Sequence, residues 1–183
     1  KESGADLLIL EMLLDVDHSK ILLNAALETG LPVWVGLSCC DSKFDNSVIG
    51  RNFRAEKEKS LIYDENKYKD QPKYLPEDKI ILLEDIIKSL TSLGGDVYGI
   101  MHTWFQDSIG GLKILKNNWK GPIMFYPEIH KFDTNTHKAI ITMTEEEFSN
   151  SILELIDDQI QIVGGCCGVN DKHLKRLIQS ISD

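Results

Sequence analysis

The sequence predicts an α/β protein built from repeated strand–helix units. Three observations support this fold class. Short, almost wholly apolar runs recur along the chain, as expected of parallel strands covered on both faces. Amphipathic segments with helical spacing lie between these runs. The chain has 183 residues, 42% of them hydrophobic, which is ordinary for a globular protein. These features indicate βα units with right-handed crossovers, in either a doubly wound sheet or a (β/α) barrel.

Five apolar runs are the candidate strands. They cover residues 7–10, 33–37, 97–101, 123–126 and 160–163. Helices are predicted over residues 17–29, 78–93 and 108–117, from Thr144 onward, and from Asn170 onward. Gly30 suits the end of the first helix. Thr144 and Glu147 form a capping box, and Asn170 can cap the last helix.

The number of units predicts an incomplete barrel. A full (β/α)8 barrel needs roughly 250 residues and eight units, whereas this chain supplies five. The opening KESGAD resembles the end of a helix followed by a turn. We therefore expect residues 1–183 to be the C-terminal portion of one barrel domain whose N-terminal strands are missing. No GxGxxG or GxxxxGK[ST] loop follows a strand, which disfavours nucleotide binding.

A long polar segment interrupts the pattern at residues 40–78. It includes SKFDNS, RAEKEK and YDENKYKDQPKYLP. A connection of this length is either functional or a solvated loop. One interpretation is a lid over the carboxyl ends of the strands, where barrel active sites lie.

Composition restricts the partners and the compartment. The net charge of −9 argues against a nucleic-acid surface. No apolar run approaches the length of a transmembrane helix, and no signal peptide is visible. The four cysteines form two adjacent pairs rather than a spaced disulfide framework. Reduced thiols or metal thiolates, and hence a cytoplasmic location, are expected.

Reactive side chains follow the predicted strands. In chain order they are Glu11, then Cys39, Cys40 and Asp41, then His102, then Tyr126 and Glu128, then Cys166 and Cys167. Because the carboxyl ends of parallel strands share one face of the fold, these groups are expected on the same side. Zinc prefers thiolate and imidazole ligands, and a catalytic site uses three protein ligands with one open position. His102, Cys166 and Cys167 would supply these three ligands.

Both cysteine pairs have alternative interpretations. GGCCG could be a tight turn with two buried thiols, and His102 could be a hydrogen-bonded structural residue. If the sulfurs of Cys166 and Cys167 face one ion, the turn must be irregular, since neighbouring side chains of a strand point apart. Cys39 and Cys40 could be incidental strand-end residues, line a donor pocket, or join the other pair in a closed four-sulfur site.

The closing segment resembles the homocysteine S-methyltransferase family. The residues that carry the resemblance are WKGPIMFYPE and EEEFSNSILELIDDQIQIVGGCCGVNDKHLKRL, with GADLLILEML and GLPVWVGLS upstream. The resemblance implies a (β/α)8 barrel that binds zinc through three cysteines, two of them in GGCCG. The third cysteine normally ends a G-[IV]-N-C pattern, which here reads GIMH, so His102 replaces it. Imidazole can bind zinc, so a His-Cys-Cys site is expected.

The resemblance also implies two substrate-binding residues. Glu11 matches a strand-end acid that holds the homocysteine ammonium group. Tyr126, from YPEIH in place of YP-N-[SA]-G, would line the pocket. A structural salt bridge for Glu11 and a core position for Tyr126 are the alternatives.

The activity implied is zinc-dependent transfer of a methyl group to the thiol of homocysteine, giving methionine. The donor could be a sulfonium, a quaternary ammonium or a methyl-corrinoid. The expected partners are these small molecules, without nucleic acid or membrane. A degenerate, non-catalytic zinc- or thiol-binding protein is the main alternative. A thiol redox protein is disfavoured because the chain has no C-x-x-C.

Overall fold

The protein is centred on a five-stranded parallel sheet. The computed structural model describes residues 1–52, 55–58, 61–62 and 80–182. The strand order is β1 (Leu8–Leu13), β2 (Val33–Leu37), β6 (Val97–Trp104), β7 (Ile123–Glu128) and β10 (Ile160–Val163). All four pairings are parallel. The order follows the chain and never reverses, which is the arrangement of a barrel segment and differs from a doubly wound sheet. The fold-class prediction is confirmed.

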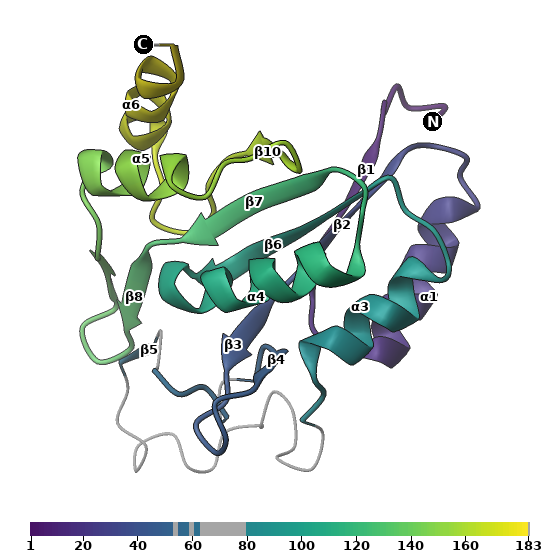
Figure 1. The fold of residues 1–183 in the computed structure, drawn as a ribbon, viewed down its shortest axis with the longest axis horizontal. Coiled ribbons are helices and arrows are strands. Elements are labelled where there is room, and N and C mark those ends of the chain that lie inside the picture. The colour runs from purple at the N-terminus through teal and green to yellow at the C-terminus, as the bar shows by residue number, and fades with distance from the viewer. Residues whose placement is uncertain (53–54, 59–60, 63–79, 183) are drawn as a thin grey trace.

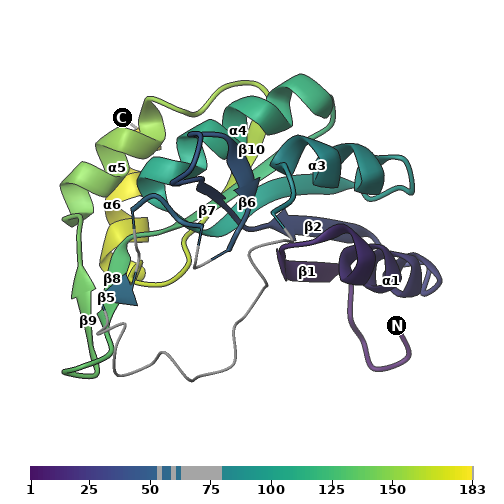
Figure 2. The ribbon, with the colours of Figure 1, turned by 90° about the horizontal axis from the view of Figure 1, so that it is seen from below.

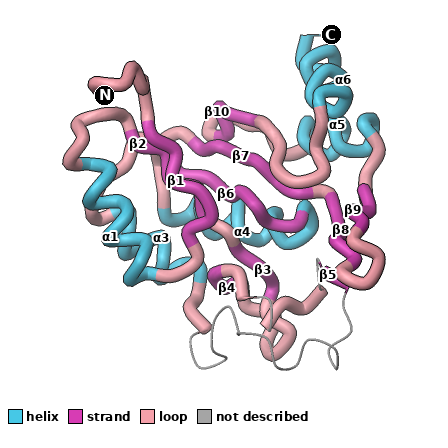
Figure 3. The backbone as a smooth tube through the Cα atoms, turned by 180° about the vertical axis from the view of Figure 1, so that it is seen from behind, coloured by secondary structure: helices cyan, strands magenta, loops and turns pink. Residues whose placement is uncertain are grey.

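Helices cover one face of this sheet (Figures 1 and 3). They are α1 (Val16–Leu27), α3 (Leu83–Thr91) and α4 (Phe105–Asn118), while α5 (Glu145–Leu153) and α6 (Asp171–Ser182) pack against each other near β10. Alternate strand residues, such as Val35, Ile100 and Phe125, point to the helices and form the main core. Met101 and Met124 point to the opposite face, where they pack with the half-buried Tyr126.

Local capping explains where the last two helices begin. The Thr144 hydroxyl accepts a hydrogen bond from the Glu147 N–H, and the Glu147 carboxylate accepts one from the Thr144 N–H. The Asn170 side chain accepts hydrogen bonds from the main-chain N–H groups of Lys172 and His173. Both predicted caps are confirmed, because each uses groups that are close in sequence.

Three strands are longer than predicted at their carboxyl ends. β1 continues past residue 10 to Leu13, β6 past residue 101 to Trp104, and β7 past residue 126 to Glu128. The pairing register shifts near the ends of β1 and β6, and the irregular parts contain Met12 and His102, whose φ angles are 58° and 46°. The prediction that Glu11, His102 and Glu128 follow the strands is corrected. They belong to the last residues of the strands, two of which end in bulges.

The polar segment after β2 begins as a hairpin. β3 (Cys39–Asp41) pairs antiparallel with β4 (Val48–Gly50). Farther along, β5 (Leu61–Ile62) joins β8 (His130–Asp133), which pairs with β9 (Lys138–Ile141). This small sheet lies at the end of the molecule opposite α1 (Figure 2). Residues 53–54, 59–60 and 63–79 of the predicted loop lie outside the described residues, so the lid remains a prediction. Among the described residues, no helix has the length and apolar character needed to cross a membrane.

Candidate metal centre

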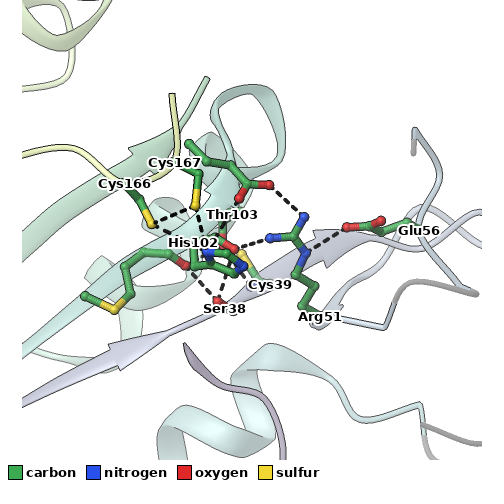
Figure 4. Close-up of polar contacts among 10 residues, drawn as sticks. Ser38, Cys39, Arg51, Glu56, His102, Thr103, Cys166 and Cys167 are labelled. Atoms are coloured by element: carbon green, nitrogen blue, oxygen red, sulfur yellow. Dashed lines mark hydrogen bonds and ion pairs between the residues drawn. The ribbon is translucent and has the colours of Figure 1, made fainter. Parts of the chain in front are cut away.

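Three donor atoms converge at the carboxyl end of β6 and in the turn after β10. The Nδ1 atom of His102 lies 3.4 Å from the Cys166 sulfur and 3.6 Å from the Cys167 sulfur. The two sulfurs are 3.8 Å apart, and all four cysteines of the chain are free thiols. Figure 4 shows the imidazole and both thiols pointing toward one another.

These spacings suit a tetrahedral zinc ion. Zinc binds thiolate sulfur at about 2.3 Å and imidazole nitrogen at about 2.0–2.1 Å, so two ligand atoms of one ion lie roughly 3.5–3.8 Å apart. His102, Cys166 and Cys167 form a group whose candidate ligand atoms all lie within 4.8 Å of one another. The donor set and its spacing are therefore compatible with zinc, which remains a prediction for this site.

An irregular turn directs the two adjacent sulfurs to the same side. The Cys166 N–H donates to the Pro127 carbonyl, and the Cys167 carbonyl accepts from the Ile129 N–H. Gly168 has a φ of +90°, a backbone conformation that favours glycine. At Gly164, a Cβ atom would lie 2.7 Å from the Tyr126 ring, so only glycine fits against that side chain. These contacts anchor the turn to β7 and produce the irregular geometry that was predicted.

The two thiols differ in acidity. The Cys167 S–H group can donate to the Cys166 sulfur, and this interaction is the largest cause of a pKa of Cys166 lowered to about 4. His102 lowers the pKa of Cys166 further. The pKa of Cys167 is raised because its proton is held by Cys166. Cys167 and His102 therefore both favour the thiolate form of Cys166.

Arg51 and Glu128 form a buried ion pair beside these donors. Arg51 is 3% exposed and Glu128 is 1% exposed. The Arg51 Nη2 atom lies 2.6 Å from Glu128 Oε1, and Arg51 Nε lies 3.0 Å from Glu56 Oε1. The other oxygen of Glu128, Oε2, lies 3.6 Å from His102 Nδ1. Glu128 also forms a second candidate donor group, with His130 and Cys167.

Sequence reasoning missed Arg51 and assigned no role to Glu128. Arg51 follows the apolar triplet Val48–Gly50 in the polar segment, for which either a solvated loop or a lid was expected. Its partner Glu128 is 77 residues away, so no local pattern connects them. The one available signal was Glu128 itself, a carboxylate at the end of an apolar strand.

The structure does not bring Glu11 into either donor group. Glu11 is exposed, beside the bulge of β1, and β2 separates β1 from β6. Tyr126 lies closer, with its ring against Gly164. Burial raises the pKa of Tyr126, so its hydroxyl stays protonated at neutral pH. The substrate-binding roles of Glu11 and Tyr126 remain predictions.

The other cysteine pair lies in the core. Cys39 packs in the main core, and Cys40 packs with Ile49 and Ala55. Within the described residues, neither candidate donor group includes Cys39 or Cys40. The four-sulfur hypothesis is therefore wrong, because the hairpin buries this pair in apolar surroundings.

A comparison with known families accounts for this arrangement. The sequence model described as homocysteine S-methyltransferase matches residues 82–181, more than half of the chain. The chain belongs to the homocysteine S-methyltransferase family. The match includes β6, β7 and the GGCCG turn, and so all three converging donors. No curated protein matches the chain.

Solved structures support the barrel architecture of this family member. The homocysteine methyltransferase MmuM from Escherichia coli, in its metallated form, is similar with a TM-score of 0.62 and 14% identity over 98% of this chain and 46% of that chain. The dihydrodipicolinate synthase DapA-2 from Bacillus anthracis has a TM-score of 0.53 and 12% identity, covering 97% and 49%. The chain therefore spans about half the length of both proteins. At these identities the likeness shows the fold alone.

Proposed function

We propose that the protein is a zinc-dependent methyltransferase that methylates homocysteine and yields methionine. The observation that carries the proposal is the convergence of His102 Nδ1 with the sulfurs of Cys166 and Cys167 at ligand spacing. Membership of the homocysteine S-methyltransferase family supports the reaction class.

The three side chains would hold zinc and leave a position for the substrate sulfur. Two thiolates balance the charge of Zn²⁺, and the neutral imidazole adds a third donor without further charge. Bound zinc would lower the pKa of the homocysteine thiol and so supply a thiolate at neutral pH. Because His102 stands where the family pattern has a third cysteine, the protein ligands carry one negative charge fewer than three thiolates would.

The chain's other residues would bind and orient the substrate. We assign the ammonium group of homocysteine to the exposed carboxylate of Glu11 and the pocket wall to the half-buried Tyr126. The rate would then come from ionisation of the thiol and from in-line placement of the two reactants.

The proposed step balances without a further reagent. The homocysteine thiol releases its proton to solvent, and the thiolate sulfur donates an electron pair to the methyl carbon and forms an S–CH₃ bond. The bond between that carbon and the donor's positively charged sulfur or nitrogen, or its corrin metal, breaks. The donor leaves with that electron pair. A sulfonium, a quaternary ammonium and a methyl-corrinoid each satisfy this requirement. We expect the reaction in the cytoplasm, where free cysteines stay reduced.

A non-catalytic zinc-binding protein is the second candidate function. Two departures from the family pattern favour it, His102 in place of the third cysteine and Glu128 in place of the asparagine of YP-N-[SA]-G. Both functions require zinc, so only activity separates them.

Metal analysis followed by an activity panel tests the proposal. Purified protein should contain about one zinc ion per chain. It should form methionine from homocysteine with at least one methylated sulfonium, quaternary ammonium or corrinoid. Zinc-loaded protein that methylates homocysteine from no donor would overturn the enzyme proposal and leave the non-catalytic one. Protein that cannot be loaded with zinc would overturn both.

A further inference from the structure

The main chain of His102 is held in an unusual conformation. Its φ angle of 46° lies in the left-handed region, which side chains other than glycine seldom adopt. The bulge of β6 sits at this position, between the register pairs of Met101 and Trp104. Strain of this kind persists only where neighbouring groups hold it in place.

Several side chains bind the carbonyl groups on either side of this bulge. The Ser38 hydroxyl lies 2.9 Å from the Met101 carbonyl and 3.1 Å from the His102 carbonyl. The Thr103 hydroxyl donates to the Met101 carbonyl and accepts from the Cys39 N–H. The Arg51 guanidinium donates to the His102 carbonyl. Figure 4 shows Arg51 and Ser38 approaching the main chain of His102.

Arg51 is itself fixed by two buried carboxylates. Glu128 accepts from Nη2 at 2.6 Å, and Glu56 accepts from Nε at 3.0 Å. A planar guanidinium presents its donors in a fixed fork, so two carboxylates and one carbonyl together determine its orientation. The second oxygen of Glu128 also lies 3.6 Å from Nδ1 of His102. The ion pair thus links β7 and the segment after β4 to the bulge of β6.

We propose that Arg51 is a positioning residue for His102. It acts through the main-chain carbonyl of His102 and holds the left-handed bulge that turns the imidazole toward Cys166 and Cys167. Glu128 orients Arg51 for this task. The inference rests on the proposed zinc site, and it gives part of the polar segment a function, since Arg51 comes from that segment.

A double-mutant cycle on zinc affinity tests the proposal. Arg51→Lys keeps the charge but loses the fork, and groups that orient a metal ligand typically contribute 10–100-fold in metal affinity. We expect Arg51→Lys to weaken Zn²⁺ binding about tenfold in the otherwise unchanged protein. In a His102→Ala background the same change should alter binding by less than about twofold, because the residue it positions is gone. Arg176→Lys, an exposed arginine of α6, is the matched control and should leave zinc affinity unchanged in both backgrounds.

A spectroscopic measurement distinguishes positioning from general damage. With Co²⁺ in place of zinc, the visible spectrum of Arg51→Lys should shift toward that of His102→Ala, since both lose the oriented imidazole. Should Arg51→Lys fail to fold, Ser38→Ala carries the same test, because it removes a hydroxyl from the same carbonyl. Equal losses of zinc affinity in both backgrounds would overturn the positioning role. Unchanged zinc affinity in His102→Ala would instead remove His102 from the proposed zinc site.

Discussion

Cys39–Cys40 and Cys166–Cys167 are the same dipeptide in two different settings. The first pair lies in the β3–β4 hairpin and is at most 1% exposed. The second lies in a glycine-rich turn, half-buried and within 3.6 Å of an imidazole. Burial raises the pKa of Cys40 to about 12, whereas the neighbouring thiol and His102 lower the pKa of Cys166 to about 4. Neighbouring groups, not the dipeptide itself, give a cysteine pair its chemistry.

The largest difference between the pairs should appear in zinc content. Cys166→Ala or Cys167→Ala removes one of three ligands, so we expect the loss of stoichiometric zinc and a fall in zinc affinity beyond about 100-fold, the upper range for outer groups. Cys39→Ala and Cys40→Ala should keep one zinc per chain. Metal analysis after dialysis measures both. A Cys166 variant that retains one tightly bound zinc would contradict the ligand assignment.

The next largest difference between the two pairs should be the rate at which their thiols are alkylated in metal-free protein. The thiolate is the reactive form of cysteine. The pH stays above the Cys166 pKa of about 4 from pH 7 down to pH 5, so this thiol stays ionised. Over the same range the pH is far below the Cys40 pKa of about 12, so this buried thiol stays protonated. We expect iodoacetamide to modify Cys166 at least about 100-fold faster than Cys40 at pH 6. Mass spectrometry of peptides resolves the two sites, and similar rates in the folded protein would refute the difference.

Replacement of His102 tests how much the imidazole beside Cys166 and Cys167 contributes to zinc binding. His102→Ala should also lower zinc affinity beyond about 100-fold, though less than Cys166→Ala does, because the lost donor is neutral and both charged sulfurs remain. His102→Cys should retain zinc, since it restores the three-cysteine set of the family pattern. A competition titration with a chelating dye measures each affinity. If the alanine variant binds zinc as well as the unchanged protein, His102 is not a ligand.

The smallest effect concerns stability at alkaline pH. Folding keeps the buried Cys40 thiol protonated, whereas the unfolded thiol ionises near pH 8.5. This contribution to stability is complete below pH 8.5 and is lost as pH rises toward 12, by at most about 1.4 kcal/mol per pH unit. Between pH 8 and 10 the free energy of unfolding should therefore fall less in Cys40→Ala than in the unchanged protein, by up to about 2 kcal/mol. Urea unfolding with a chelator present measures this, and equal losses would contradict it.

The sequence predicted those features that depend on local pattern. Apolar runs predicted β2 and β10 with their observed bounds, and short-range caps predicted the starts of α5 and α6. That His102, Cys166 and Cys167 lie close together was predicted, because strand ends collect on one face of a parallel sheet. The bulge at His102 was not predicted, since Ser38 and Arg51, which bind its carbonyl, come from elsewhere in the chain. Features that depend on contacts between distant residues leave no periodic signal.

The position of the donors along the chain has a mechanical consequence. His102 and Cys166 are 64 residues apart; His102 lies in β6, Cys166 lies in the turn after β10, and β7 separates these two strands. An ion bound to both would act as a reversible staple around that loop, and closing a loop of this length constrains the unfolded chain by about 4 kcal/mol in the entropic treatment of cross-links. Removal of the ion would then loosen the segment from β10 to α6 selectively. Addition of a chelator should therefore speed amide hydrogen exchange more in that segment than in β2.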